Sequence, residues 1–149
     1  MFLDVRSDIV IDAPRERVWE YLADFGRHTE WSQPEHHLRI QPPSELRPGA
    51  TFTSIGNELT HDWHNTATIT AVVPGERLEF VASHDGSSWR NFFELSDSGS
   101  GTRVTKGENF VSARFPMIVL VAVLSPWLTW ESKRVFAADL ARIKARLER

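Results

Sequence analysis

Apolar and charged residues alternate over the first segment of the chain, residues 5–11, and this period-two pattern is typical of a β-strand with one face towards a core. Pro14 follows, at a place where its fixed φ angle favours the first turn of a helix. Apolar residues then recur at helical spacing from Val18 to Phe25, and Gly26 interrupts them. The pattern predicts a strand, a short amphipathic helix, and a second short helical turn that ends at Trp31.

The middle of the chain has the pattern of consecutive strands and turns. Turn signals such as Pro74-Gly75 and Asp85-Gly86 separate segments rich in β-branched and aromatic residues. These predicted strands cover residues 50–57, 59–73, 77–83, 88–96 and 102–111. Consecutive hairpins of this kind predict an antiparallel meander.

The period becomes helical from Arg114 onwards, and the chain closes with an amphipathic helix. Its apolar stripe consists of Phe136, Leu140, Ile143 and Leu147. The opposite, charged face contains Arg134, Asp139, Arg142, Lys144 and Arg146. A strand, two short helices, a meander and a long final helix predict an α+β domain in which the helix lies across a curved sheet.

Length and composition restrict the classes of protein that fit. A chain of 149 residues fits one domain spanning residues 1–149. The net charge of −3 and the scattered Lys and Arg residues do not match the basic surface of a nucleic-acid-binding protein. The chain has no cysteine, which excludes disulfides, thiolate metal sites and a cysteine nucleophile. No secretory signal pattern opens the chain, so we expect a cytoplasmic protein.

Residues 115–130 carry no charge, yet they do not fit a transmembrane helix. The segment has 16 residues and contains prolines at 116 and 126, whereas a spanning helix needs about 20 residues. Two interpretations stay open: the buried start of the last helix, or an apolar lip that gates a cavity or makes transient contact with a membrane or a partner. Pro126 predicts a kink or a helix start near Ser125, which would leave residues 115–124 mobile.

Six motifs along the chain resemble the polyketide cyclase/dehydrase and lipid-transport family of the START-like superfamily, also called Bet v 1-like or SRPBCC. They are I-x-A-P-x-x-x-V-W-x-x-L-A-D at 11–24, H-x-x-W at 28–31, Pro48-Gly49, P-x-E-R-L-x-F at 74–80, G-T-R-V-T at 101–105 and D-L-x-R-I-K-x-R-L-E at 139–148. The resemblance implies a helix-grip fold, with a curved seven-stranded antiparallel sheet around the C-terminal helix. It also implies a small hydrophobic ligand, lipid- or polyketide-like, in a cavity between the sheet and that helix.

Large aromatic residues are the predicted lining of such a cavity, or alternatively the filling of a closed core. They are Phe52, Trp63, Phe80, Trp89, Phe93, Phe110 and Trp127. Three polar residues lie in phase with apolar ones on the strands: His61, Lys106 and Glu108. Because burying an unpaired polar group is costly, we expect Lys106 and Glu108 to form an ion pair at the cavity mouth, unless the end of the strand is solvated.

The sequence contains no pattern that predicts a metal or a cofactor. His61 and His64 lie three residues apart, which places them on opposite faces of a strand rather than together. No G-x-S-x-G elbow and no glycine-rich nucleotide loop is present. If the protein is an enzyme, we expect proton transfer in the cavity, with His61, Glu108 or Tyr21 as the acid or base.

Three functions therefore stay open from the sequence. The first is binding or transport of a small hydrophobic molecule, and the second is a cyclase or dehydrase reaction in the same cavity. The third is a protein-interaction module with a filled core and an exposed apolar surface at 115–130. A homodimer is also left open.

Overall fold

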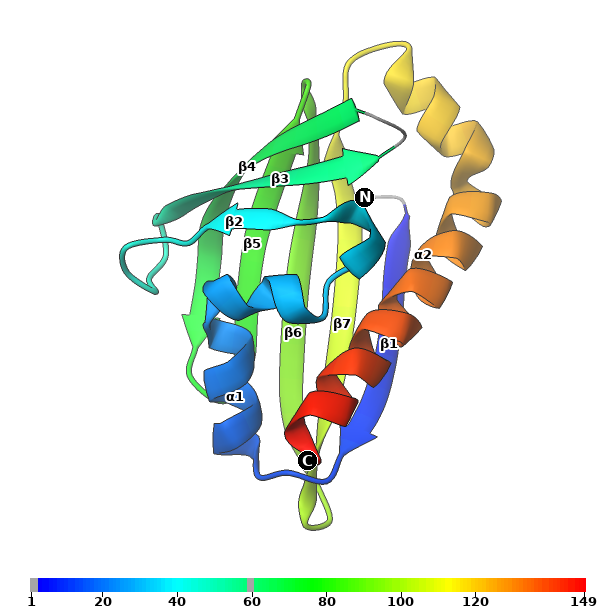
Figure 1. Cartoon of the computed structure of the whole chain (residues 1–149). Coiled ribbons are helices and arrows are strands. Elements are labelled where there is room, and N and C mark those ends of the chain that lie inside the picture. The colour runs from blue at the N-terminus through cyan, green and yellow to red at the C-terminus, as the bar shows by residue number, and fades with distance from the viewer. Residues whose placement is uncertain (1–2, 59–60) are drawn as a thin grey trace.

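The computed structural model describes residues 3–58 and 61–149. It contains a seven-stranded sheet, two α-helices and two short 3₁₀ helices (Figure 1). In chain order the elements are β1 (Asp4–Ile11), α1 (Arg15–Ala23), η1 (Phe25–Glu30), η2 (Pro34–His36), β2 (Arg39–Gln41), β3 (Thr51–Glu58), β4 (His61–Val73), β5 (Arg77–His84), β6 (Ser87–Ser98), β7 (Gly101–Ser112) and α2 (Met117–Leu147).

The sheet is antiparallel throughout, with the strand order β1-β7-β6-β5-β4-β3-β2. Strands β3 to β7 form the predicted meander, and β1 returns to pair with β7. Figure 1 shows the sheet curving, with α2 lying across its open side. The predicted helix-grip α+β fold is confirmed. Residues 59–60, at which we predicted the strand 59–73 to begin, lie outside the described residues.

The main hydrophobic core lies between the sheet, α1 and the C-terminal half of α2. Val18 and Leu22 of α1 pack there with Leu78 of β5 and with Leu140 and Ile143 of α2, and each is at most 1% exposed. A smaller cluster joins β1, β7 and the middle of α2, and its buried members are Leu3, Val5, Phe110, Val121 and Phe136. The predicted apolar stripe of the last helix therefore faces the sheet, as expected from its spacing.

The face of the sheet away from α2 also carries one buried aromatic ring. Phe92 is 1% exposed, and the guanidinium groups of Arg6, Arg77 and Arg90 lie 5.0, 4.8 and 5.9 Å from the centre of its ring. Its neighbour across the sheet is Gly107, where an added Cβ would lie 2.1 Å from the ring. The glycine thus makes room for a ring that three cations cover.

Helix α2 begins at Met117, and not near Ser125 as one reading of the sequence suggested. Pro126 lies inside the helix, and Figure 1 shows that the helix axis is bent rather than straight. The first two turns are not a buried helix start, because Val119, Leu120 and Val123 are 49%, 51% and 70% exposed. Within residues 3–58 and 61–149, none of the helices has the length and hydropathy that a bilayer-spanning segment requires.

Candidate functional site

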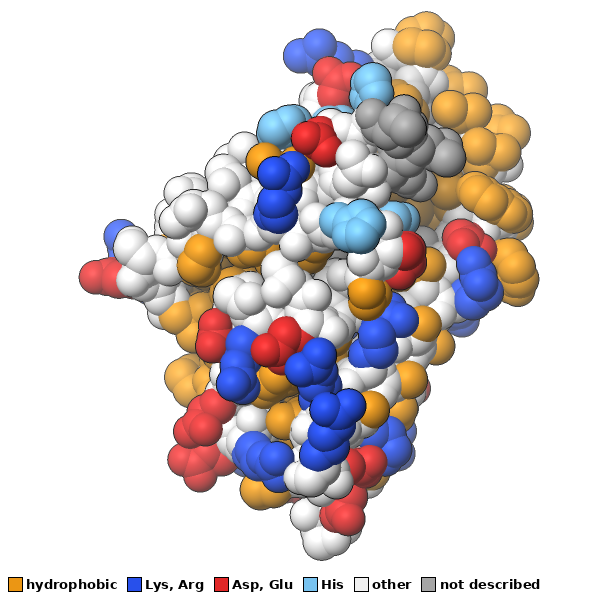
Figure 2. Space-filling view, in the orientation of Figure 1, with side chains coloured by type: hydrophobic (Ala, Val, Ile, Leu, Met, Phe, Trp, Pro, Cys, Tyr) orange, Lys and Arg blue, Asp and Glu red, His pale blue; other side chains and the backbone are white. Residues whose placement is uncertain are grey.

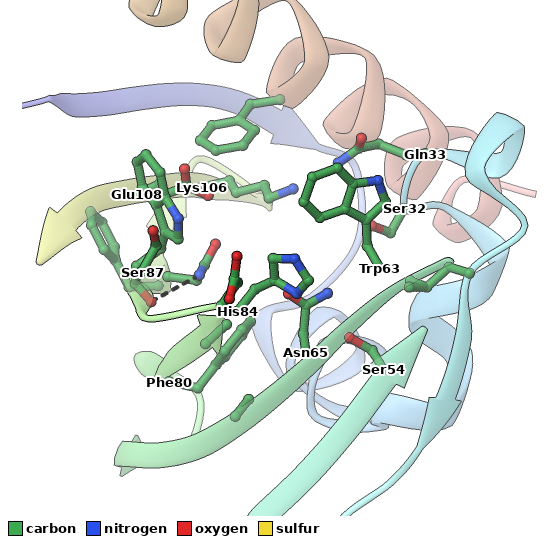
Figure 3. A pocket seen from close by; sticks show the side chains of 18 of the residues that line it. Ser32, Gln33, Ser54, Trp63, Asn65, Phe80, His84, Ser87, Lys106 and Glu108 are labelled. Carbon is green, nitrogen blue, oxygen red and sulfur yellow. Dashed lines mark hydrogen bonds between the residues drawn. The ribbon is translucent and has the colours of Figure 1, made fainter. Parts of the chain in front are cut away.

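A cavity of about 1310 Å³ lies between the sheet and the N-terminal half of α2 (Figure 3). Strands β3 to β7, η1 and the start of α2 all contribute lining side chains. The cavity reaches the molecular surface, since the lining residues Trp63 and Phe115 are 42% and 81% exposed. Its volume exceeds the roughly 300–1,000 Å³ of common small-molecule pockets.

Five of the seven aromatic residues predicted to line a cavity do so. Phe52, Phe80 and Phe93 form the inner wall, and the rings of Phe52 and Phe80 meet edge to face with centroids 5.3 Å apart. Trp89 lines the part near β7, and Trp63 lies at the mouth against His84, with ring centroids 4.6 Å apart. These rings give the cavity flat, mostly apolar walls.

The other two aromatic residues do not line it. Phe110 is 1% exposed and belongs to the smaller core cluster, where its ring lies 4.8 Å from that of Trp89. Trp127 is 57% exposed on α2 and lies outside the lining. The predictions for these positions were wrong because α2 covers the end of β7 that contains Phe110, and because the helical position of Trp127 faces away from the sheet.

The buried ion pair of the site differs from the predicted one. Lys106 is 7% exposed and lines the cavity, but its Nζ lies 2.6 Å from Oδ2 of Asp139 on α2, and Lys106 and Glu108 form no salt bridge. Oδ1 of the same carboxylate accepts hydrogen bonds from Nη2 of Arg142 at 2.6 Å and from the backbone N–H of Gln33 at 3.2 Å. One buried carboxylate therefore holds two cations and joins β7, α2 and the loop after η1.

Sequence reasoning placed Asp139 on the charged outer face of the last helix, and this was wrong. Asp139 is fully buried, beside Leu140 and one turn after Phe136. The signal that could have found it is Lys106, since a lysine in phase with buried residues needs an anionic partner from the element packed on that strand.

Glu108 projects from β7 into the cavity two residues after Lys106 (Figure 3). It is half-buried, and within the described ranges its carboxyl group makes no hydrogen bond or ion pair. Burial raises the pKa of Glu108 to about 7, although the positive charge of Lys106 acts in the opposite direction. A carboxyl group of this kind can exchange a proton near neutral pH.

His28 is a buried histidine of the site that the sequence motif contained but that we did not single out. It lines the cavity, and its Nε2 donates to the carbonyl oxygen of Leu22 at 2.7 Å. Its ring contacts Phe25 and Trp31, with centroids 4.6 and 4.8 Å away. Burial lowers the pKa of His28 to about 4, so the ring is neutral at pH 7.

Two predicted acid or base residues lie outside the cavity. His61 is exposed at the start of β4, two residues before Trp63, and it lies beyond the edge of the cavity. The hydroxyl of Tyr21 donates to Oε2 of Glu30 at 2.8 Å, on the side of the molecule near Arg146. Burial, together with this carboxylate, raises the pKa of Tyr21 to about 12.

The remaining polar lining is mostly uncharged and was not anticipated. It comprises Ser32, Gln33, Ser54, Asn65, Ser87 and Asn91, with His84, Asp85 and Arg114 nearer the surface. Across residues 3–58 and 61–149, no group of three His, Asp or Glu side chains could hold a metal ion. The site can therefore bind through aromatic contacts, a few hydrogen bonds, one buried ammonium group and one titratable carboxyl group.

Residues 12–114 match the protein family described as Activator of Hsp90 ATPase homolog 1-like protein. A search of curated proteins found no match. The predicted START-like superfamily is confirmed by this match together with the structural neighbours.

Protein CV1439 from Chromobacterium violaceum is 17% identical with a TM-score of 0.73, and the alignment covers 100% of this chain and 99% of that chain. The Aha1 dimer from Colwellia psychrerythraea has a TM-score of 0.62 at 14% identity, with 99% and 97% covered. DynU16, from the dynemicin biosynthetic locus, has a TM-score of 0.67 at 20% identity, and the alignment covers 99% of this chain but 48% of DynU16. At these low identities the TM-scores show a shared fold.

Proposed function

Since the chain belongs to the Activator of Hsp90 ATPase homolog 1-like family, we propose that it binds a small, largely hydrophobic molecule in the cavity between the sheet and α2. The observation that carries this proposal is the cavity itself, about 1310 Å³ with aromatic walls and few charged groups. Concave apolar space with a few polar groups is the usual form of a ligand site.

The size of the cavity also argues against a module with a filled core. Such a module would have to close the space with side chains, because interiors normally pack to the density of organic crystals. Here Phe52, Phe80 and Phe93 stand around the space instead of filling it. The family description names an activator of another protein. If this chain also has a protein partner, that partner would bind the outer surface of a protein whose interior contains a cavity.

Glu108 favours a second candidate function, proton transfer on a bound substrate. Its carboxyl group faces the cavity, has no partner among the described residues, and has a pKa of about 7. A cyclase or dehydrase reaction needs a group that gives or takes a proton at neutral pH. In this alternative Glu108 takes the acid/base role for which the sequence offered His61, Glu108 or Tyr21, and Trp89 and Phe93 position the substrate.

The exposed start of α2 supports a route into the cavity through an apolar lip. Phe115, Leu120 and Val123 line the cavity and are also 81%, 51% and 70% exposed. Figure 2 shows apolar side chains gathered along the edge of the molecule formed by α2. Trp127 and Trp130 continue this surface, and rings of this kind suit the boundary between water and lipid. In this proposal the lip contacts a membrane surface when the ligand enters. A second copy of the chain is the alternative partner for the same apolar surface, and binding measurements with lipid vesicles would distinguish the two.

Native mass spectrometry of the purified protein, followed by a fluorescence titration with pyrenebutanol, tests the binding proposal. Ala82→Trp places a large ring in the cavity and should abolish binding of this neutral probe. Ala137→Trp adds the same ring at an exposed position of α2 and is the matched control. The proposal is wrong if no small molecule copurifies and pyrenebutanol binds both variants and the unmodified protein equally weakly.

A further inference from the structure

The inner wall of the cavity contains a buried positive charge, and the proposed function does not yet say which class of ligand would complement it. Lys106 is the one buried cation among the described lining residues, because Arg114 is exposed. Asp139 carries a single negative charge, which it shares between Lys106 and Arg142. Arg142 approaches Oδ1 from outside the lining, whereas Lys106 approaches Oδ2 from the cavity side. The three side chains together have a net charge of +1, and of the two cations only the ammonium group of Lys106 faces the cavity.

The ammonium group of Lys106 also keeps donor capacity. It has three N–H groups, and Asp139 accepts from one of them. The rings of Phe136 and Trp31 lie next to it, with centroids 4.4 and 5.2 Å from Nζ. An aromatic face is a weaker partner than an anionic oxygen, so an acceptor that enters the cavity gains a charge-assisted hydrogen bond here.

Glu108 lies two residues along the same strand and faces the same space (Figure 3). Its neighbours across the sheet are Asn91 on β6 and Val5 on β1, and neither is charged. Besides Glu108, the charged and titratable groups that line the cavity are His28, His84, Asp85, Lys106 and Arg114; Asp139 contacts Lys106, and Arg142 contacts Asp139. Glu108 is thus a carboxyl group without a partner in the described part of the chain, placed two residues from the cavity's buried cation on the same strand.

We infer that the cavity selects a hydrophobic acid, whose anionic head accepts one hydrogen bond from Lys106 and one from the protonated carboxyl group of Glu108. The inference rests on the proposed function and adds the ligand class to it. A bound anion beside an ionised Glu108 would place two negative charges together, so the acid binds the protein in which Glu108 is protonated. The positive charge of Lys106 disfavours a cationic ligand. A neutral ligand provides no anionic acceptor, so the remaining N–H donors of Lys106 would stay against the rings of Trp31 and Phe136.

Paired titrations with pyrenebutyric acid and pyrenebutanol test this inference, because the two probes differ only in the head group. At about pH 6 the acid should bind at least tenfold more tightly than the alcohol. Between about pH 6 and pH 8 its affinity should fall roughly tenfold, since only the fraction of protein with protonated Glu108 accepts the anion. Binding of the alcohol should stay the same over this range. Dodecanoic acid, used as a competitor, shows whether an aliphatic acid is taken as well as an aromatic one.

Two variants locate the effect. Glu108→Gln keeps a donor without a charge, so the acid should bind tightly at both pH values. The double variant Lys106→Met/Asp139→Asn removes the buried Lys106–Asp139 charges together, keeps an amide oxygen as acceptor for the partly exposed Arg142, and should abolish the preference for the acid. Glu76→Gln, in the turn between β4 and β5, is the control carboxylate outside the cavity and should behave like the unmodified protein.

The outcomes separate the two proposals. If the acid and the alcohol bind equally well, the ligand class is wrong while binding in the cavity stands. If the acid is preferred but Glu108→Gln keeps the same pH dependence, the role of Glu108 is wrong. If neither pyrenebutyric acid nor pyrenebutanol binds, the proposed function itself fails.

Discussion

Lys106 on β7 and Asp139 on α2 form a buried ion pair, with Nζ and Oδ2 2.6 Å apart. The pair joins the last strand to the last helix at the inner wall of the cavity. Because Arg142 and the N–H of Gln33 bind the other carboxylate oxygen, Asp139 has partners on both sides. The contact therefore fixes the position of α2 and presents an ammonium group to the cavity at the same time.

Removing one partner of this pair should destabilise the protein strongly. Asp139→Ala leaves the ammonium group of Lys106 buried without an anion, and we expect the free energy of unfolding to fall by about 3–5 kcal/mol. Urea denaturation followed by tryptophan fluorescence measures this loss. Lys106→Met/Asp139→Asn removes both charges of the pair and keeps an oxygen acceptor for Arg142 and for the N–H of Gln33, so it should recover part of the stability. A loss below about 1 kcal/mol in Asp139→Ala would contradict the buried pair.

Glu108 should make the protein less stable as the pH rises. Its pKa is raised in the folded state to about 7, so the folded protein holds a proton that the unfolded chain releases from about pH 4.5. The contribution of Glu108 to the free energy of unfolding is complete below about pH 4.5 and is lost as the pH rises through about 7. Glu108→Gln should remove this slope and gain about 2 kcal/mol at pH 8, after allowance for its partial exposure. Thermal unfolding of both proteins from pH 5 to pH 8 measures the difference, and parallel curves would disprove it.

His28 should act in the opposite direction. Its pKa is lowered in the folded state to about 4, so the unfolded chain binds a proton that the folded protein excludes. The stability from this residue is complete above pH 6.5 and is lost as the pH falls towards 4, by about 3 kcal/mol in total. His28→Gln keeps a donor for the carbonyl oxygen of Leu22 and does not titrate. In this variant the free energy of unfolding should therefore fall less steeply between about pH 6.5 and pH 4. An NMR titration in which His28 changes shift near pH 6.5 would refute the expectation.

Gly107 should not tolerate a side chain. A Cβ there would lie 2.1 Å from the ring of Phe92, which three arginines hold in place. We expect Gly107→Ala to cost about 2–3 kcal/mol, as overpacking of a buried site does. Gly56→Ala on β3 is the matched control, because its nearest neighbour is 4.0 Å away. Adding Phe92→Leu to Gly107→Ala should restore part of the loss, and equal stability of the two glycine variants would count against this packing.

The fold was predictable because each element carries its own period. Alternation predicted β1 and β3 to β7, and the stripe from Phe136 to Leu147 predicted the packed half of α2. The three residues of β2 are too few to show a period, and its place in the sheet comes from pairing with β3. Local pattern and global architecture agree wherever a segment is long enough to show a repeat.

The site was predictable only in part, because its polar contacts join residues far apart in sequence. Lys106 and Glu108 were correctly placed in one inward phase, but the partner of Lys106 lies 33 residues away on a helix. Asp139 sits at the edge of an apolar stripe, where helical periodicity alone cannot tell a buried from an exposed position. His61 lies on the predicted face of β4, but at the end of the strand that extends beyond the cavity. The period of two predicts which face of a strand a residue lies on, and it does not predict how far along the strand the cavity extends.

The first turns of α2 should exchange their amide hydrogens faster than its last turns. From residue 118 to 124 only Val121 is buried, whereas Phe136, Asp139, Leu140, Ile143 and Leu147 anchor the later part. Pro126 has no N–H, so the helix also lacks the bond that this position would give to Ala122. Hydrogen exchange measured by mass spectrometry should show weaker protection for residues 118–124 than for residues 140–147. Pro126→Ala restores the missing donor and should slow exchange in the first segment, and so should pyrenebutanol by filling the space beneath Leu120 and Val123. Equal protection of both segments without the probe would mean that the lip is as rigid as the packed half of the helix, and that entry to the cavity uses another route.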